Sequence, residues 1–187
     1  MKKYVLIAGV NGVGKSTLCQ LVPNLRNLPR INPDEILQEF GNWRKPSDML
    51  AAGKIAIERI STYLENGTSF SQETTLCGHS ILRNINSAKQ KGYSIELHYI
   101  GIESPELAKQ RVRLRVQKGG HGIPEKYIER RYFDSLNNLK KILDICDLVA
   151  FYDNTKSFYR FAIYKNGIPV RLSKNIPTWF EKHILNK

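Results

Sequence analysis

The sequence is poor in cysteine and has no long apolar segment. Its three cysteines, Cys19, Cys77 and Cys146, form no CxxC pair and have no histidine at zinc-ligand spacing, which argues against a zinc site and against a disulfide framework. No apolar stretch approaches the roughly 20 residues that a membrane-spanning helix needs. The apolar run after Lys2 and Lys3 is short and lacks a cleavage pattern. We therefore expect no secretory signal, no membrane insertion and a reducing, cytoplasmic setting.

Acidic residues are scarce relative to basic ones. The chain has 29 lysines and arginines against 17 aspartates and glutamates, a net charge of +12. This surplus indicates an anionic partner, and the candidates are a nucleic acid, a membrane surface and a phosphorylated small molecule. Charge alone does not choose among them. Many of the cations lie between Lys109 and Arg131.

Apolar, β-branched runs alternate with amphipathic segments. This alternation predicts strands near 3–8, 30–32, 69–72, 93–100 and 148–152, with helices between them, then a hairpin around Asn166-Gly167 and a helix at 178–185. The predicted fold is α/β: a three-layer α/β/α architecture of P-loop NTPase type with a mainly parallel five-stranded sheet. We expect one domain over 1–187, with a helical lid at about 109–131 and a C-terminal hairpin and helix at about 156–187.

One motif predicts a phosphate-binding loop. Residues 9–16 read GVNGVGKS, which matches G-x-x-x-x-G-K-[ST] and lies between a predicted strand and a predicted helix. In such a loop, backbone N–H groups cradle phosphate oxygens, the lysine reaches the β- and γ-phosphates, and the serine hydroxyl binds Mg²⁺. The motif predicts ATP and Mg²⁺ as cofactors, Ser16 as the metal ligand, and nucleotide binding by Gly9, Asn11, Gly12, Val13, Gly14, Lys15, Ser16 and Thr17.

Signatures of other P-loop proteins are missing. No DxxG follows the third predicted strand and no NKxD occurs later, which argues against a switch GTPase. The strand at 93–100 ends without the carboxylate expected of a motor or transporter ATPase. A phosphotransferase remains, and its chemistry needs positioned cations and an acid that accepts the proton of the acceptor hydroxyl.

Carboxylates follow two of the predicted strands. Asp34 comes just after the second strand and is the predicted general base; the alternative is a helix-capping role, which Asn32 and Glu35 already fill. Glu73 and Thr75 end the third strand and are predicted to bind the hydroxyls of a polyol. The alternatives for them are a water-bridged strand end or a group that orients a magnesium-bound water.

Arginines flank a glycine-rich loop at 119–122. Arg111 and Arg115 are one helical turn apart, and Arg130 and Arg131 lie on the next helix. We expect the two helices to act as a lid that delivers guanidinium groups to the transferred phosphate. His121, within the loop, is assigned no role.

These motifs together resemble the zeta-toxin family of P-loop kinases over roughly residues 3–155. The matching stretches are AGVNGVGKST, INPDEI, SQETTLCG, RVRLRVQKGGHGIPEKYIERRYFDSLNNL and FYDNT. The resemblance implies an ATP-dependent kinase of the 3′-hydroxyl of UDP-N-acetylglucosamine, with an antitoxin protein as a partner. It also implies roles for individual residues: Asp34 and Lys15 as catalytic, Glu73 and Thr75 as substrate-binding, Arg115 and Arg131 as phosphate-binding, and Asn154 beside the adenine.

The residues after 155 do not map onto that pattern, and two other readings stay open. One is a kinase of a different hydroxyl, such as that of another metabolite or a nucleic-acid end. The other is a nucleotide-gated RNA-binding protein that uses the basic hairpin KNGIPVRLSK. Aromatic residues do not interleave with the cations of that hairpin as a base-stacking platform requires, so the sequence favours a small-molecule acceptor over nucleic acid.

Overall fold

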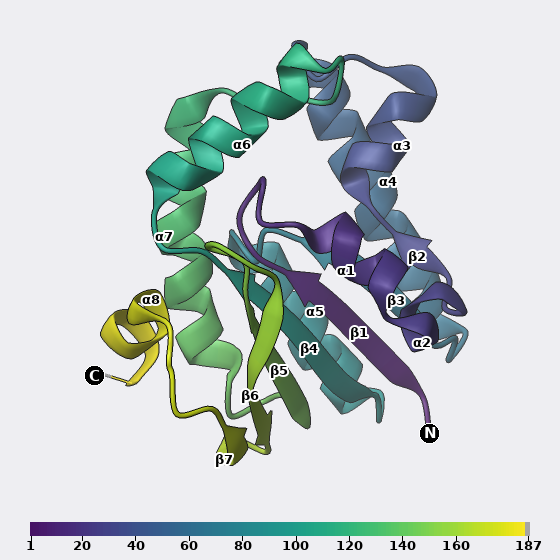
Figure 1. Ribbon diagram of the computed structural model, residues 1–187. Coiled ribbons are helices and arrows are strands. Elements are labelled where there is room, and N and C mark those ends of the chain that lie inside the picture. The colour runs from purple at the N-terminus through teal and green to yellow at the C-terminus, as the bar shows by residue number, and fades with distance from the viewer. Residues whose placement is uncertain (186–187) are drawn as a thin grey trace.

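A computed structural model describes residues 1–185 and contains one seven-stranded sheet (Figure 1). The strand order is β2-β3-β1-β4-β5-β6-β7, in which β1 to β5 are parallel and β6 and β7 are antiparallel. The strands are β1 (Lys3–Ala8), β2 (Arg30–Ile31), β3 (Phe70–Thr74), β4 (Ser94–Gly101), β5 (Leu148–Asp153), β6 (Tyr159–Lys165) and β7 (Ile168–Leu172).

The predicted α/β class and mainly parallel sheet are confirmed, but the strand count is not five. The predicted hairpin pairs along β5, with Val149 opposite Tyr164, and so becomes β6 and β7 of the same sheet. The edge of β5 is apolar and would otherwise leave backbone groups without partners, so the antiparallel pairing covers it.

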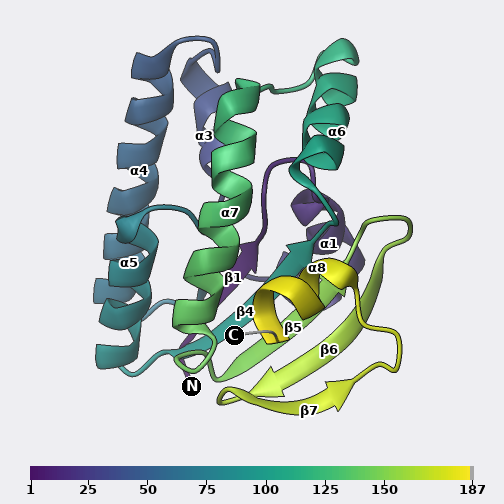
Figure 2. The ribbon, with the colours of Figure 1, turned by 90° about the vertical axis from the view of Figure 1, so that its left-hand side faces the viewer.

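Helices lie on both faces of the sheet. Behind it in Figure 1 are α5 and α7, with α1 in front, and Figure 2 shows α4, α5 and α7 side by side. The helices are α1 (Lys15–Leu21), α2 (Pro23–Arg26), α3 (Pro33–Phe40), α4 (Pro46–Glu65), α5 (His79–Gln90), α6 (Pro105–Gln117), α7 (Glu125–Ile142) and α8 (Thr178–Phe180), followed by a π-helical turn, η1 (Glu181–Leu185). Within residues 1–185, none of them has the length and apolar character that crossing a bilayer requires.

Two helices near the carboxyl ends of the strands begin at a side-chain cap. At α3 the Asn32 side chain accepts a hydrogen bond from the backbone N–H of Asp34 (3.0 Å), and Pro33 occupies the first turn. At α6 the Ser104 hydroxyl accepts a hydrogen bond from the N–H of Leu107 (3.2 Å). These caps fix α3 and α6 above the carboxyl edge of the sheet, where ligands of parallel sheets bind (Figure 1).

The C-terminal segment is tied to the same edge. The indole of Trp179 stacks over Gly101, which leaves room for the ring because it has no side chain. The indole N–H donates to the Asp153 carboxylate (2.8 Å), and the next residue, Phe180, packs edge-on against Phe151 with ring centres 4.8 Å apart. The chain end therefore buttresses the loop that follows β5.

Candidate active site

The 9–16 loop has the conformation that its glycines permit. Gly9, Gly12 and Gly14 all have positive φ angles, of 140°, 86° and 98°. The Lys15 ammonium folds back over the loop and donates to the carbonyl oxygens of Gly9 (2.8 Å) and Val10 (3.2 Å). Burial lowers the pKa of Lys15, and the nearby carboxylates of Glu73 and Asp34 oppose that effect. The loop is thus a preformed cradle at the N-terminus of α1.

Two adjoining cavities open beside this loop. The P-loop cavity, of about 450 Å³, lies between residues 11–17, α3 and residues 111–121 of α6 and the loop after it. The α4 cavity, of about 260 Å³, lies between α3, α4 and the end of β3. Residues that line both are Asn11, Lys15, Asn32, Asp34, Glu73 and His121. The carboxyl groups of Asp34 and Glu73 thus lie at both cavities, beside the 9–16 loop.

The Asp34 carboxylate does not cap α3, because the Asn32 side chain already accepts the hydrogen bond from the Asp34 backbone N–H. The Asp34 side chain is 45 % exposed and lines the cavities. One carboxylate oxygen lies 3.6 Å from Nε2 of His121. A carboxylate that lines both cavities can accept a proton from a hydroxyl held in one of them while a phosphate is held in the other.

Glu73, in contrast, is buried and has partners on both carboxylate oxygens. Its Oε1 accepts a hydrogen bond from Nη1 of Arg30 (2.6 Å) and lies 3.5 Å from Sγ of Cys19, and its Oε2 lies 3.3 Å from the Ser16 hydroxyl. Burial raises the pKa of the Cys19 thiol to about 11, so this cysteine is neutral. The Glu73 carboxylate therefore points to Ser16, while Thr75 lines only the α4 cavity.

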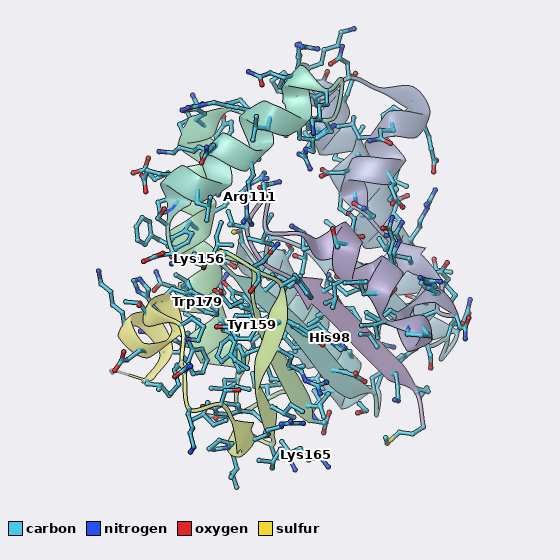
Figure 3. The ribbon with its side chains drawn as sticks, in the orientation of Figure 1. His98, Arg111, Lys156, Tyr159, Lys165 and Trp179 are labelled. Carbon is cyan, nitrogen blue, oxygen red and sulfur yellow. The ribbon has the colours of Figure 1, made fainter. Side chains whose placement is uncertain are left out.

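The arginines of α6 and α7 that were predicted to form a lid occupy different places. Nη1 of Arg111 and both Nε and Nη2 of Arg115 are buried with no hydrogen-bond partner among the described residues, and both side chains line the P-loop cavity. Figure 3 shows Arg111 between α6 and the P-loop. Arg131 lines the α4 cavity and donates from Nη1 to the Asn11 side chain (3.1 Å). Arg130 lines neither cavity and points to Asp134 (3.9 Å) on the exposed face of α7.

Asn154 lies behind the P-loop, at neither cavity. Its Nδ2 donates to the Val13 carbonyl (2.8 Å), and a side chain at Gly14 would collide with it. The next residue, Thr155, is held by Asp153 through its hydroxyl (2.8 Å) and accepts from Nη2 of Arg111 (3.1 Å). The loop after β5 thus connects the P-loop, α6 and α8.

Sequence reasoning missed two residues of this site. His121 lines both cavities with a side chain only 10 % exposed, although no role was assigned to it. The signal was its place in the GGH-x-IP stretch between the two arginine-bearing helices. Arg30 pairs with Glu73 because β2 lies next to β3, and no local pattern reveals that neighbourhood.

The donor set suits Mg²⁺ held together with a phosphate better than a protein-only metal cage. Among residues 1–185, no group of three or more His, Cys, Asp or Glu side chains is placed to hold a metal ion. Mg²⁺ usually takes one or two protein oxygens and completes its shell with waters and phosphate oxygens. The Ser16 hydroxyl beside the Glu73 carboxylate fits that requirement.

Comparisons with known proteins give the family and the fold of the chain. An uncharacterized protein of Haemophilus influenzae is 32 % identical over 130 residues, which are 70 % of this chain and 92 % of that protein. A structure from the PezAT chromosomal toxin-antitoxin system of Streptococcus pneumoniae aligns with a TM-score of 0.64 at 21 % identity and covers 86 % of this chain and 72 % of that one. The AvrRxo1-ORF1:AvrRxo1-ORF2 structure with ATP aligns with a TM-score of 0.66 at 13 % identity, over 91 % of this chain and 60 % of that one. The Zeta toxin family model matches residues 1–163, and the chain therefore belongs to the Zeta toxin family, with the fold of a P-loop phosphotransferase.

Proposed function

We propose that the protein transfers the γ-phosphoryl group of ATP, with Mg²⁺, to a hydroxyl of a small molecule, and that the preferred acceptor is the 3′-hydroxyl of UDP-N-acetylglucosamine. The observation that carries the proposal is that Asp34 and Lys15 line both of two adjoining cavities. Membership of the Zeta toxin family and the likeness in fold to a complex that contains ATP support it.

The P-loop cavity is the proposed site of the triphosphate. Its N–H groups and Lys15 bind phosphate oxygens, and the unpaired nitrogens of Arg115 and Arg111 supply further donors from the lid. Buried guanidinium nitrogens without a partner are costly, and a phosphate would remove that cost. Mg²⁺, when bound at Ser16, neutralises charge on the phosphates; Glu73 orients the Ser16 hydroxyl for it.

The α4 cavity is the proposed acceptor site. Thr75 and Glu73 contribute polar groups at the end of β3, and Met49 and Ala52 of α4 contribute an apolar wall. The acceptor oxygen attacks the γ-phosphorus, the new O–P bond forms as the bond to the β–γ bridging oxygen breaks, and ADP leaves with that electron pair. The hydroxyl proton passes to the Asp34 carboxylate.

The direct test is a product assay. Purified protein is incubated with ATP, Mg²⁺ and a panel of sugar nucleotides, free sugars and a 5′-hydroxyl oligonucleotide, and the products are weighed by mass spectrometry. We expect a gain of one phosphate on UDP-N-acetylglucosamine. Phosphorylation of another panel member would support phosphotransferase activity but overturn UDP-N-acetylglucosamine as the acceptor. If the protein binds ATP and no panel member gains a phosphate, the proposed phosphotransferase activity itself is overturned.

The role of Asp34 has its own test. Asp34→Asn keeps the shape of the side chain and removes the base, so we expect kcat to fall about 10²–10⁴-fold with little change in the melting temperature. Asn32 retains the helix cap in this variant, which makes a stability effect small. A folding defect with activity retained would assign Asp34 to the structure of α3 instead.

An inhibitory protein partner is the remaining part of the proposal. It rests on the toxin-antitoxin system to which one structural neighbour belongs. Toxicity on expression in a bacterial host that is abolished by Asp34→Asn would support it, because only an active kinase needs such a partner.

A further inference from the structure

His121 occupies an unusual place for a loop residue. It lies in the turn between α6 and α7, yet its imidazole is 10 % exposed and lines both cavities. Its Nε2 is 3.6 Å from Oδ1 of Asp34, which belongs to α3 on the opposite side of the P-loop cavity. The imidazole therefore approaches the carboxylate from the lid side of the site.

The loop around His121 is built for this approach. Gly120 lies so close to Arg115 that a Cβ there would be 2.7 Å from Cγ of that side chain, and a Cβ at Gly122 would be 2.7 Å from the Trp43 ring. Trp43, in the segment between α3 and α4, also packs against the imidazole with ring centres 5.9 Å apart. Gly120 thus lets the loop fold back on Arg115 of α6, and Gly122 lets it dock against Trp43; these two contacts set the position of His121.

We propose that His121 is a positioning residue for the base: its Nε2–H binds Oδ1 of Asp34 and leaves Oδ2 directed at the acceptor hydroxyl. This inference rests on the proposed function, in which Asp34 accepts the hydroxyl proton. The distance of 3.6 Å is longer than a hydrogen bond, and such contacts commonly tighten only when substrates are bound. Because His121 belongs to the lid, the base reaches its working orientation only when the lid is docked on α3.

The charges that face His121 fit a neutral donor. Burial lowers the pKa of His121, the Asp34 carboxylate opposes this shift, and the Arg115 guanidinium adds to it. The imidazole is therefore neutral near pH 7 and offers a single N–H. A neutral donor orients Asp34 without adding the positive charge that would weaken it as a base.

Kinetic variants test the positioning role. His121→Phe keeps a ring against Trp43 but has no donor, and we expect kcat to fall about 10- to 100-fold, the effect of one hydrogen bond to a charged group, with the KM for ATP nearly unchanged. His121→Gln keeps a nitrogen donor near the Nε2 position and should recover most of that loss. Equal activity of the Phe variant and the wild type would overturn the proposal, and so would equal losses in the Phe and Gln variants with a weakened affinity for ATP, which would assign His121 to lid packing.

A titration tests the contact without any turnover. The chain has four histidines, so the His121 ring signal can be identified by NMR from its absence in His121→Gln. Since Asp34 raises the pKa of His121, Asp34→Asn should lower the measured pKa of this histidine and leave those of the other three in place. An unchanged value for His121 would show that the two groups do not meet in solution. Failure to phosphorylate any acceptor in the assay above, with this titration as expected, would instead overturn the proposed reaction alone.

Discussion

The two walls of the site treat buried charge in opposite ways. On the sheet side, the Glu73 carboxylate has Arg30, Ser16 and Cys19 around it. On the lid side, Arg115 has two buried nitrogens and Arg111 has one with no partner among the described residues. A buried charge that keeps its partner is tolerated, whereas an unpaired one costs free energy and persists where a ligand supplies its partner. The difference separates residues that hold the site in shape from residues that await an anion.

Removing a guanidinium on the lid side should have the largest effect on the rate of the reaction. Arg115→Ala is expected to lower kcat by about 10³-fold, because an arginine that stabilises the transferred phosphate contributes at least that much in related chemistry. The same change removes an unpaired buried charge, so the melting temperature should stay level or rise.

Arg130→Ala is the matched control for that change. Arg130 is also on the lid but is 67 % exposed and lines neither cavity, so both its rate and its melting temperature should match the wild type. An Arg115→Ala protein that melts several degrees lower while its kcat is preserved would make Arg115 a structural residue.

Removing the cation on the sheet side, Arg30, should instead lower the stability of the fold. Arg30→Met leaves the Glu73 carboxylate buried without its closest partner, and breaking a fully buried pair costs roughly 3–5 kcal/mol. Arg30 is 31 % exposed, so we expect a loss of about 2 kcal/mol in the free energy of unfolding, measured by urea denaturation.

A surface pair gives the control for this effect. Arg59 and Glu39 are 3.7 Å apart and both well exposed, so Arg59→Met should change the free energy of unfolding by less than about 0.5 kcal/mol. Adding Glu73→Gln to Arg30→Met should recover part of the loss, since the unpaired charge is then gone. No recovery in the double variant would mean that Arg30 stabilises the fold through packing or through its ion pair with Glu35, and not through Glu73.

The lid and sheet walls also differ in how far the sequence predicts them. The P-loop, the Asn32 cap and the position of Asp34 follow from local patterns, because each depends on residues a few positions apart. The partners of Glu73 depend on β2 lying beside β3, and the place of His121 depends on the lid docking near Trp43. Both are contacts between residues far apart in the sequence, which local periodicity does not predict. For the same reason no local pattern separates the neighbours Arg130 and Arg131, although Arg131 lines the α4 cavity and Arg130 lines neither cavity. The hairpin joined the sheet because β5 had an unpaired edge.

The smallest expected effect concerns a paired carboxylate away from both cavities. The hydrogen bond with His98 (2.9 Å) lowers the pKa of Glu96 below its usual value, Lys3 adds to this, and burial opposes it. A carboxyl whose pKa is lower in the folded state stabilises the fold above its unfolded pKa, near 4.5, and loses that contribution as the pH falls through the folded value. As the pH falls from about 5 to about 3, the free energy of unfolding should therefore decrease more in the wild type than in Glu96→Gln, with a difference of less than about 1 kcal/mol. Because Glu96 lines neither cavity, kcat at pH 7 should be equal in the two proteins. Parallel stability curves, or a lower kcat in the variant, would show that charged residues outside the site do not divide into those that stabilise the fold and those that bind a ligand.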